Sequence, residues 1–525
     1  QIITEAIDLE MDGLDMEKVY AYKDANDKEG LFKYLIIVQC NALSSIMPRM
    51  FQRIADYTEL LFPDNLLREG SVIQQMIELI PEDDWKDAVQ IIGWLYQFYN
   101  IEPKAEVFAK KTGKISKEEI PAATQLFTPD WIVRYMVENS LGRLWVEGHP
   151  NDALKAGWKY YLDEAKQEPE VQTQLAEIRK GYASITPEQI KCIDPCSGSG
   201  HICAYMFDVL MRIYEAYGYT AREAVRSIVE NNIYGLDIDE RAAQLAYFSV
   251  MMKARQYDKR FLTRKDEDGK PDVPRPHVYE IFESNGLDRS AIDYFIGDDP
   301  EIKKAINSLI SEMHDAKEYG SILNITPVDF KALYRRFDEV LSDPSIFNLV
   351  IENDLLPLVR VSEILAQKYD VVITNPPYMS VSAIGAKLNT YVMRNYPDSK
   401  ADMFAVFMEK CKAMLKINGY QAMITMHAWM FLASYENLRK KIYRQHIVNI
   451  AHLGPRAFEE ISGEIVQTTS FVFRNSYTKN YRGVYRRLVE YASQSKKEEA
   501  FLTGEGQYTS KQDGFDAIPG APVAY

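Results

Sequence analysis

The stretch KCIDPCSGSGHICAYMFDVL, from Lys191 to Leu210, decides the fold of this chain. A short apolar strand ends in the loop DPCSGSG (Asp194–Gly200), and an apolar helix begins directly after it. Glycine lets the backbone come close to a ligand, and the N-terminus of a helix favours a negatively charged group. The loop lacks the GxxxxGK[ST] pattern, which disfavours a phosphate-binding P-loop. A tight structural turn could use Gly198 and Gly200 equally well, so the loop alone does not establish a ligand site.

Outward from this stretch, short apolar strands alternate with helices. The further strands that we expect are, in chain order, IYGLDID, HVYEIFESNG (277–286), YDVVITNPPY, YQAMITM and IVNIAHL. Strands that alternate with helices predict an α/β fold with a parallel, doubly wound sheet. The later segments TTSFVFRN and RGVYRRLVE predict closing antiparallel strands.

A carboxylate stands at the end of the second expected strand, in GLDID (235–239). In such sheets a carboxylate at this place can hydrogen-bond both hydroxyl groups of a ribose. We favour this role for Asp237 because it follows the glycine loop in the order that such folds use. Asp239 precedes the helix ERAAQLA, where an N-cap is the better interpretation.

The tetrapeptide NPPY, Asn375 to Tyr378, directly follows the strand VVIT. Its two prolines fix the backbone and remove two N–H donors. The Asn375 amide oxygen and nearby carbonyl groups can then point at one amino group, and Tyr378 offers a flat face for stacking. These are the needs of a site that accepts an extruded base and holds its exocyclic amine. The alternative is a proline-rich turn that only closes a strand, which the position beside the glycine loop disfavours.

The N-terminal part of the chain predicts helices. The segments 65–80 and 85–100 carry apolar residues at spacings of three and four, and residues 1–115 therefore predict a helical N-terminal domain. We expect another helix to start at Pro129, with Thr128 as its N-cap.

The rest of the chain divides into two expected parts. Residues 116–493 predict the α/β domain, with an insertion at about 257–348 that contains charged, solvated loop sequence. Residues 494–525 are polar and contain glycine, so we expect a linker toward a missing target-recognition region. Too few residues follow the last strand segment to form a target-reading domain of ordinary size.

Composition limits the class of protein. The formal net charge of −15 argues against broad nonspecific DNA binding by the whole surface, because phosphate contacts need Lys and Arg, but it leaves room for a local basic cleft. No apolar run reaches about 18 residues, so we expect no transmembrane helix and no membrane partner. The 5 cysteines form no CxxC pair and have no His partner at metal spacing. We therefore expect no metal site, and reduced thiols in a bacterial cytoplasm.

Four motifs together carry a family resemblance. LFTP (126–129), DPCSGSG, GLDID and NPPY resemble the motifs of the amino-methyltransferases of DNA, in the order in which cofactor binding precedes catalysis. The resemblance spans roughly residues 124–475. More narrowly, IIGWLYQFYN, DPCSGSGHICAYMFDVL, the insertion with YGSIL, and HLGPRAFEEISGEIVQTTSFVFRN are similar to the adenine methyltransferases of bacterial BREX phage-exclusion systems, the PglX-like family.

The resemblance implies a fold, a cofactor and a substrate. The fold would be that of a methyltransferase dependent on S-adenosylmethionine (SAM), Rossmann-like, with a seven-stranded, mostly parallel sheet. SAM would be the cofactor, and double-stranded DNA with a flipped-out adenine the substrate.

The resemblance also implies roles for single residues. In the cofactor site, Phe127 and Thr128 would hold the methionine end of SAM, Asp237 the ribose, and Ile238 and Glu283 would contact the adenine of SAM, while the loop around it would be formed by Asp194, Cys196, Gly198 and Gly200. In the catalytic site, the residues are Asn375, Pro376, Pro377 and Tyr378. Asn375 and the carbonyl of Pro376 would accept hydrogen bonds from the target N6 amine, and Tyr378 would stack on the flipped base.

Three alternatives stay open. Restriction–modification fusion enzymes share part of the pattern, and Asp84 with Glu102-Pro103-Lys104 can be forced onto a D…ExK nuclease motif, whose carboxylates hold catalytic metal ions. These residues lie in helical sequence, so ordinary surface charges are favoured. The chain could also be a docking subunit that senses SAM or DNA beside other phage-defence proteins. Cytosine, RNA or protein glutamine can also occupy NPPY-type sites, although the BREX-like segments favour adenine in DNA.

Overall fold

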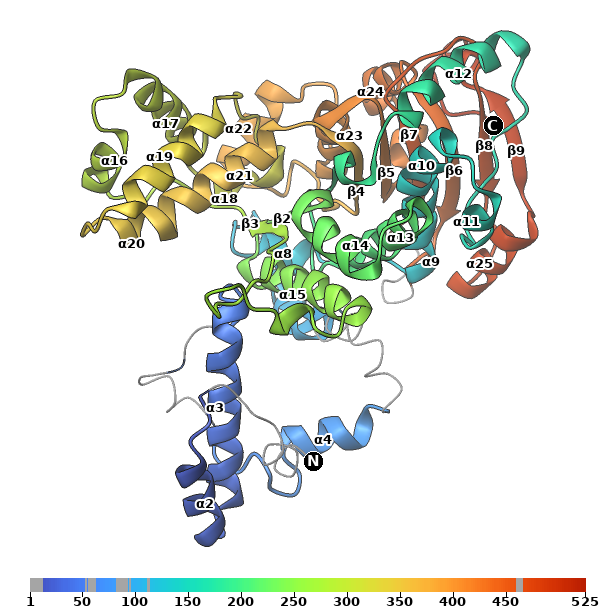
Figure 1. Ribbon diagram of the computed structural model, residues 1–525. Helices are drawn as coiled ribbons and strands as arrows, with labels where there is room; N and C mark the ends of the chain where they lie inside the picture. The colour runs from blue at the N-terminus through green and yellow to red at the C-terminus, as the bar shows by residue number, and fades with distance from the viewer. Residues whose placement is uncertain are drawn as a thin grey trace.

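A computed structural model gives the fold of the chain (Figure 1), and it describes residues 13–51, 54, 63–81, 93, 96–110, 114–458 and 466–525. The described residues contain one nine-stranded sheet with the spatial order β3-β2-β1-β4-β5-β7-β6-β8-β9. The strands are β1 (Cys192–Asp194), β2 (Ile233–Asp237), β3 (His277–Glu280), β4 (Tyr369–Thr374), β5 (Leu415–Met426), β6 (His446–Gly454), β7 (Thr468–Arg474), β8 (Arg482–Arg487) and β9 (Gln507–Lys511).

The sheet is mostly parallel, as predicted. Strands β3, β2, β1, β4 and β5 pair in parallel along one half of the sheet. Strand β7 runs antiparallel to both β5 and β6, and β9 runs antiparallel to β8. The α/β class is therefore confirmed, but the expected number of seven strands is wrong, because β8 and β9 extend the sheet.

Two expectations about the end of the chain are wrong. The segment that forms β8 is predicted to be antiparallel, but β8 pairs in parallel with β6, whose other side pairs antiparallel with β7. Residues 494–525 do not form a linker: they contain helix α25 (Gln494–Thr503) and edge strand β9. Phe515 and Val523 beyond them are buried in the core, so apolar contacts hold this polar segment on the body of the protein.

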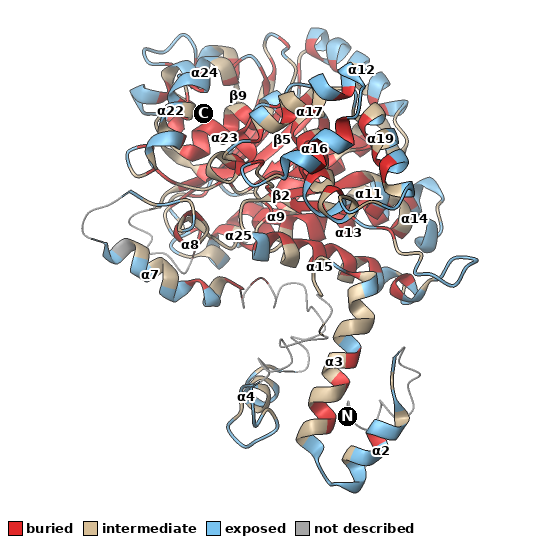
Figure 2. Cartoon of the chain, turned by 90° about the vertical axis from the view of Figure 1, so that its left-hand side faces the viewer, coloured by how far each residue is buried: buried red, intermediate tan, exposed pale blue. Residues whose placement is uncertain are grey.

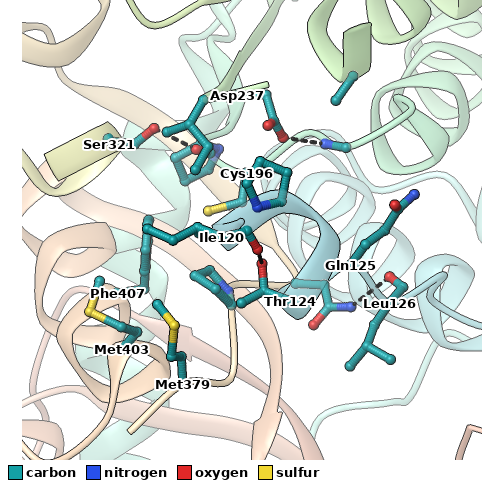
Figure 3. Close-up of a pocket in the computed structure, with 18 of the residues that line it drawn as sticks. Ile120, Thr124, Gln125, Leu126, Cys196, Asp237, Ser321, Met379, Met403 and Phe407 are labelled. Atoms are coloured by element: carbon teal, nitrogen blue, oxygen red, sulfur yellow. Dashed lines mark hydrogen bonds between the residues drawn. The ribbon is translucent and has the colours of Figure 1, made fainter. Parts of the chain in front are cut away.

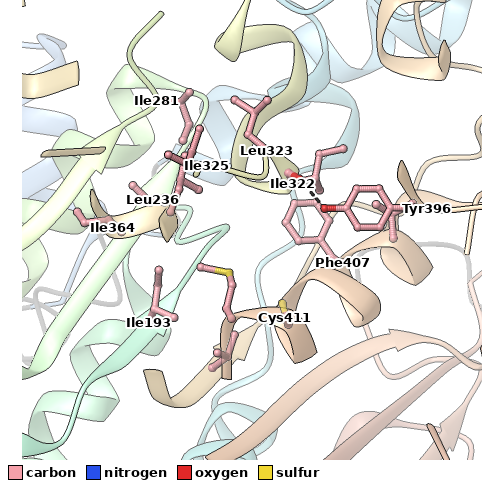
Figure 4. Close-up of a cluster of buried hydrophobic side chains, with 14 of the residues drawn as sticks. Ile193, Leu236, Ile281, Ile322, Leu323, Ile325, Ile364, Tyr396, Phe407 and Cys411 are labelled. Carbon is pink, nitrogen blue, oxygen red and sulfur yellow. Dashed lines mark hydrogen bonds between the residues drawn. The ribbon is translucent and has the colours of Figure 1, made fainter. Parts of the chain in front are cut away.

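The main helices that surround the sheet are α9 (Asp130–Val137), α10 (Arg143–Gly148), α12 (Pro169–Ala183), α13 (His201–Tyr217), α14 (Ala221–Ser227), α15 (Glu240–Tyr257), α21 (Leu356–Ala366), α22 (Ala386–Asn395), α23 (Met403–Met414) and α24 (Glu436–Ile442). They bury both faces of the sheet, and neighbouring residues of β4 show this directly. Val371 and Ile373 belong to the apolar cluster with α13 and α15, whereas Val372 belongs to the cluster with α21 and α23. This alternation is what the two-residue period of a strand requires. Figure 4 shows part of the second cluster, to which both Ile193 of β1 and Cys411 of α23 belong.

The insertion after β3 forms a helical lobe. It contains α16 (Arg289–Ile296), α17 (Pro300–Glu312), α18 (Ala316–Tyr319), α19 (Phe330–Ser342) and α20 (Asn348–Val350). In Figure 1 this lobe lies to the left of the sheet. Its apolar side chains belong to the same buried cluster as α21 and α23, so the lobe packs continuously with that face of the sheet.

The N-terminal residues that are described form α2 (Met16–Asp24), α3 (Lys28–Ile46), α4 (Val72–Leu79), α7 (Ile101–Ala109) and α8 (Ile120–Thr124). Figure 2 shows that α2, α3 and α4 stand below the buried body and carry mostly exposed or half-buried residues. The end of α3 reaches the sheet edge, where Arg49 Nη1 donates to the carbonyl oxygen of Val278 at 2.8 Å. The guanidinium group of Arg49 also lies 3.7 Å from the ring centre of Tyr279.

Candidate functional site

A pocket opens at the carboxyl ends of β1, β2 and β4, where ligands bind in open α/β sheets (Figure 3). Its walls come from segments that are distant in the sequence. One side is polar and includes Gly198, Asp237 and Ser321, and the other is apolar and includes Met379, Met403 and Phe407. A pocket with an apolar wall and a few convergent polar groups is the usual form of a small-molecule site.

Asp237 is the central polar group of this pocket. Its Oδ2 accepts a hydrogen bond from the backbone N–H of Gly198 at 2.8 Å, and its Oδ1 accepts one from the N–H of Asp239 at 2.9 Å. Burial raises the pKa of Asp237 from 3.8 to about 6, although these backbone donors oppose the rise. The carboxyl group is thus fixed in direction with one edge toward the pocket, which suits a ligand that donates from two hydroxyl groups.

Two glycines of the loop adopt left-handed backbone conformations. Gly198 and Gly200 adopt positive φ angles of 51° and 86°. A Cβ atom on Gly200 would lie 2.6 Å from the Cα atom of Ala246, so only glycine fits where α13 and α15 approach. Gly198 lines the pocket, whereas Gly200 shapes the loop behind it.

Asp194 is the last residue of β1 and the first residue of the loop. It is buried, and its Oδ1 accepts hydrogen bonds from Thr374 Oγ1 at 2.7 Å and from the N–H of Cys196 at 3.1 Å. Burial raises the pKa of Asp194 to about 7, and the charge of Asp237 acts in the same direction. Asp194 does not line the pocket but ties the loop to the end of β4.

The NPPY loop follows β4 and lies on the pocket wall through Asn375 and Pro377. Asn375 Nδ2 donates to the carbonyl oxygen of Leu126 at 3.3 Å and to Thr128 Oγ1 at 3.1 Å. Because the Leu126 carbonyl can only accept, these contacts fix which end of the amide is nitrogen. Asn375 Oδ1 is buried and accepts no hydrogen bond from the part of the chain that the structure describes. A buried acceptor without a donor is costly unless a ligand supplies one.

Tyr378 and the residues after it are held firmly. The Tyr378 hydroxyl donates to the carbonyl oxygen of Ile424 on β5 at 3.1 Å. Asp402 Oδ1 accepts from the N–H of Met379 at 3.0 Å and caps α23 through the N–H of Phe404 at 3.2 Å. The ring of Tyr378 is therefore fixed by its own hydroxyl group and by the loop that follows.

The structure separates the expected cofactor residues into two groups. Cys196 and Ile238 line the pocket together with Gly198 and Asp237. Phe127, Thr128 and Glu283 do not line it.

The residues outside the pocket have other contacts. The Phe127 ring stacks on His201 with centroids 4.6 Å apart. Glu283 Oε2 accepts from the N–H of Lys317 at 3.4 Å, and its Oε1 lies 3.6 Å from Lys117 Nζ. Thr128 is not the N-cap of α9, because Pro129 occupies that position and Thr128 instead supports Asn375.

Two pocket walls were not predicted. Glu318 and Ser321 come from the insertion, and Ser321 Oγ donates to the carbonyl oxygen of Pro195 at 2.6 Å. Tyr96 comes from the N-terminal region, and its hydroxyl donates to Asp239 Oδ2 at 2.8 Å. The segments YGSIL and IIGWLYQFYN carried a signal in the family resemblance, but their contacts with the pocket depend on the path of the chain.

The residues that the structure describes form no site that supports the nuclease alternative. Asp84 lies outside the described residues. Glu102 and Lys104 lie on helix α7, and Lys104 Nζ donates to the carbonyl oxygen of Gln125 at 3.0 Å. Within the described ranges, no group of three or more His, Cys, Asp or Glu side chains could hold a metal ion. The described helices also include none that is both long and apolar enough to cross a membrane.

Comparison with known proteins finds similar sequences. Residues 231–458 match the family model described as Eco57I restriction-modification methylase. The chain is 41% identical over 518 residues to the adenine-specific methyltransferase BrxX of Escherichia coli O9:H4 (strain HS), across 95% of this chain and 42% of that protein. It is 39% identical over 537 residues to the adenine-specific methyltransferase PglX of Lacticaseibacillus casei (strain Zhang), across 97% of this chain and 43% of that protein.

The likeness to solved structures is more distant. A nuclease-deletion mutant of the Type ISP restriction-modification enzyme LlaGI in complex with a DNA substrate mimic aligns over 91% of this chain and 38% of that chain, with 13% identity and a TM-score of 0.43. The chain spans less than half the length of BrxX and of PglX. Over that span the chain is similar in sequence to both of these adenine-specific methyltransferases, in line with the resemblance that its motifs carry.

Proposed function

We propose that this chain is the catalytic core of a site-specific DNA methyltransferase that transfers a methyl group from SAM to N6 of an adenine flipped out of double-stranded DNA. Asn375 carries the proposal, because its buried Oδ1 has no donor among the described residues and lies where the pocket meets the NPPY loop. An exocyclic amine is the kind of donor that this oxygen needs. The names of BrxX and PglX support adenine as the target.

The residues of the pocket fit SAM. Asp237 offers carboxylate oxygens to the two ribose hydroxyl groups, and the apolar wall with Ile238 and Phe407 suits a purine ring. Phe127 and Thr128 do not line the pocket but remain our candidates for the methionine end, through the hydrogen bond between Asn375 and Thr128. SAM supplies an electrophilic methyl group when it is bound.

The chain's own groups would prepare the target amine. The lone pair of an aromatic amine is delocalised into the ring, so the nitrogen is a poor nucleophile. Hydrogen bonds from the amine to Asn375 Oδ1 and to the Pro376 carbonyl would bias the nitrogen toward tetrahedral geometry. Pro376 and Pro377 have no N–H groups that would repel the amine. Tyr378, fixed by Ile424, would stack on the base and hold it in position, which supplies much of the acceleration.

A place in phage defence is supported by the family resemblance alone and not by the geometry of the site. The resemblance to BREX methyltransferases favours a role beside other defence proteins in a bacterial cytoplasm. A docking subunit that binds SAM or DNA without catalysis would keep the Asp237 pocket and show no methyl transfer.

The test is Asn375→Ala, assayed for SAM binding by calorimetry and for transfer of labelled methyl groups to adenine in DNA. We expect SAM to bind as in the parent while transfer is abolished. Asn395→Ala on α22 is the matched control, since Asn395 is exposed and its Nδ2 donates only to its own helix, at Tyr391. Equal turnover by the Asn375 variant and the parent would overturn the catalytic assignment, and SAM binding without any transfer by the parent would support the docking role.

A further inference from the structure

A short N-terminal segment, Gly93 with Tyr96–Asn100, lies directly against the cofactor pocket. A Cβ atom on Gly93 would lie 2.6 Å from Phe127 Cε2 and 2.9 Å from Ser199 Oγ, so the backbone of this segment touches both the LFTP motif and the glycine loop. Tyr96 lines the pocket itself and is buried. The segment is part of the IIGWLYQFYN motif, to which the proposed chemistry assigns no role.

Tyr96 is joined to the ribose side of the pocket by hydrogen bonds. Its hydroxyl donates to Asp239 Oδ2 at 2.8 Å. The backbone N–H of Asp239 donates to Asp237 Oδ1 at 2.9 Å, and Asp239 Oδ1 caps α15 through the N–H of Arg241 at 2.8 Å. Asp239 thus connects Tyr96, Asp237 and the start of α15, through its carboxylate and its backbone N–H.

Residues next to Tyr96 in the sequence form hydrogen bonds with residues in or beside the same pocket. Arg241 Nη1 donates to the Tyr99 hydroxyl at 2.9 Å. Asn100 Nδ2 hydrogen-bonds Gln125 Oε1, and Gln125 lines the pocket. Tyr99 itself is largely exposed, with 60% of its surface accessible, and does not line the pocket. The segment is therefore attached through residues that form or adjoin the cofactor site.

We propose that Tyr96–Asn100 together with helix α7, residues 96–109, forms a dockable wall of the SAM pocket, in which Tyr96 couples cofactor binding to docking of the N-terminal helical region. This inference rests on the proposed function, because it takes SAM as the ligand. Binding of SAM fills the space that Tyr96 and Asp237 enclose and so favours the docked segment. Linkage is reciprocal: whatever SAM contributes to docking, docking contributes to SAM affinity.

The test compares SAM binding and hydrogen exchange in the parent, Tyr96→Phe and Tyr257→Phe. Tyr96→Phe keeps the ring and removes the hydroxyl group that Asp239 accepts from. A hydrogen bond to a charged group corresponds to about a tenfold change in affinity or more. Because this hydrogen bond also exists without SAM, its loss acts on SAM binding through the docked segment, and we expect the Kd for SAM to rise by up to about tenfold in Tyr96→Phe. Tyr257→Phe is the matched control, because its hydroxyl also donates to a carboxylate, Asp208 Oδ1 at 3.0 Å, but lies away from the pocket and the segment, and it should bind SAM like the parent.

Hydrogen exchange measures the protection of the backbone amides in residues 96–109 directly. Addition of SAM to the parent should slow amide exchange in residues 96–109, while α12, on the surface away from the pocket lining, should be unaffected. Tyr96→Phe should lose most of that protection at matched SAM saturation. The comparison in the parent needs no variant, so it decides the proposal even if a variant folds poorly.

The outcomes are distinct. If the parent binds SAM but residues 96–109 gain no protection, or Tyr96→Phe binds as tightly as the parent, the dockable wall is overturned and the proposed function stands. If the folded parent does not bind SAM, both are overturned.

Discussion

Asp237→Asn changes the charge in the SAM pocket and keeps the size of the side chain. Burial raises the pKa of Asp237 from 3.8 to about 6. At 1.36 kcal/mol for each pKa unit, holding this group ionised at neutral pH costs about 3 kcal/mol of folding free energy. Asparagine removes that cost, but it cannot accept from both the Gly198 and the Asp239 N–H groups. An unsatisfied buried N–H costs about 1–3 kcal/mol, so the two effects nearly cancel and the stability of the free chain should change little.

The affinity for SAM should change much more. A hydrogen bond between a ribose hydroxyl group and a carboxylate is worth about 1.5–3 kcal/mol, so loss of one such bond raises the Kd for SAM by about 10- to 150-fold. Calorimetry measures the Kd, and thermal melts with and without SAM measure stability and the shift that SAM causes. We expect nearly equal melting temperatures without SAM and a much smaller shift with it. A variant that binds SAM within about threefold of the parent would refute the assignment of Asp237 to the ribose.

Two further predictions follow from the same pocket. The apparent Kd for SAM should be about tenfold higher at pH 5 than at pH 7, because the ionised carboxyl group binds the ribose and the pKa of Asp237 is about 6. The free energy of unfolding depends on pH in the opposite direction from SAM affinity. The contribution of Asp237 to it is fully present below pH 3.8 and is lost as the pH rises through about 6. A flat Kd between pH 5 and 7 in titration calorimetry would contradict the first statement. Gly200→Ala should lower the free energy of unfolding by about 2 kcal/mol or more in denaturant melts, because its φ of 86° is strained for alanine and the new Cβ meets Ala246. The matched Gly181→Ala, in α12 with nothing within 4 Å, should gain about 0.5–1 kcal/mol, and an equal loss in both variants would contradict this reasoning.

The strands beside the site could be predicted because each is a short apolar run that ends in an unusual loop. DPCSGSG follows β1 and NPPY follows β4, and both loops lie on the pocket as their sequences predict. Strand β9 gave no such signal, since Gln507–Lys511 is polar and mostly exposed at the sheet edge. Its strand structure depends on pairing with β8, which is a tertiary contact and not a local preference.

The walls of the pocket show a second limit of local reasoning. Ser321 and Pro195 are hydrogen-bonded but lie 126 residues apart in the sequence. No periodicity or spacing connects the two, because the contact depends on how the insertion lobe packs against α23 and β2. Thr128 illustrates the opposite error: a residue with a good local role as N-cap is used for a distant partner, Asn375, at 3.1 Å.

The segments that form the pocket are far apart in the sequence, so the ribosome synthesises them at different times. Tyr96 and Phe407 face the same space, with parts of β1, β2 and β4 between them in the sequence. A ligand that binds only the native state stabilises it by about 2.7 kcal/mol at a concentration of 100 times its Kd. In this chain that stabilisation would become available only after α23 has been synthesised and packed, since Met403 and Phe407 of α23 form part of the pocket wall. SAM would therefore act as a late check on folding: a nascent chain that stops before Phe407 would not sense the cofactor, and the capacity to bind it would arise in one step.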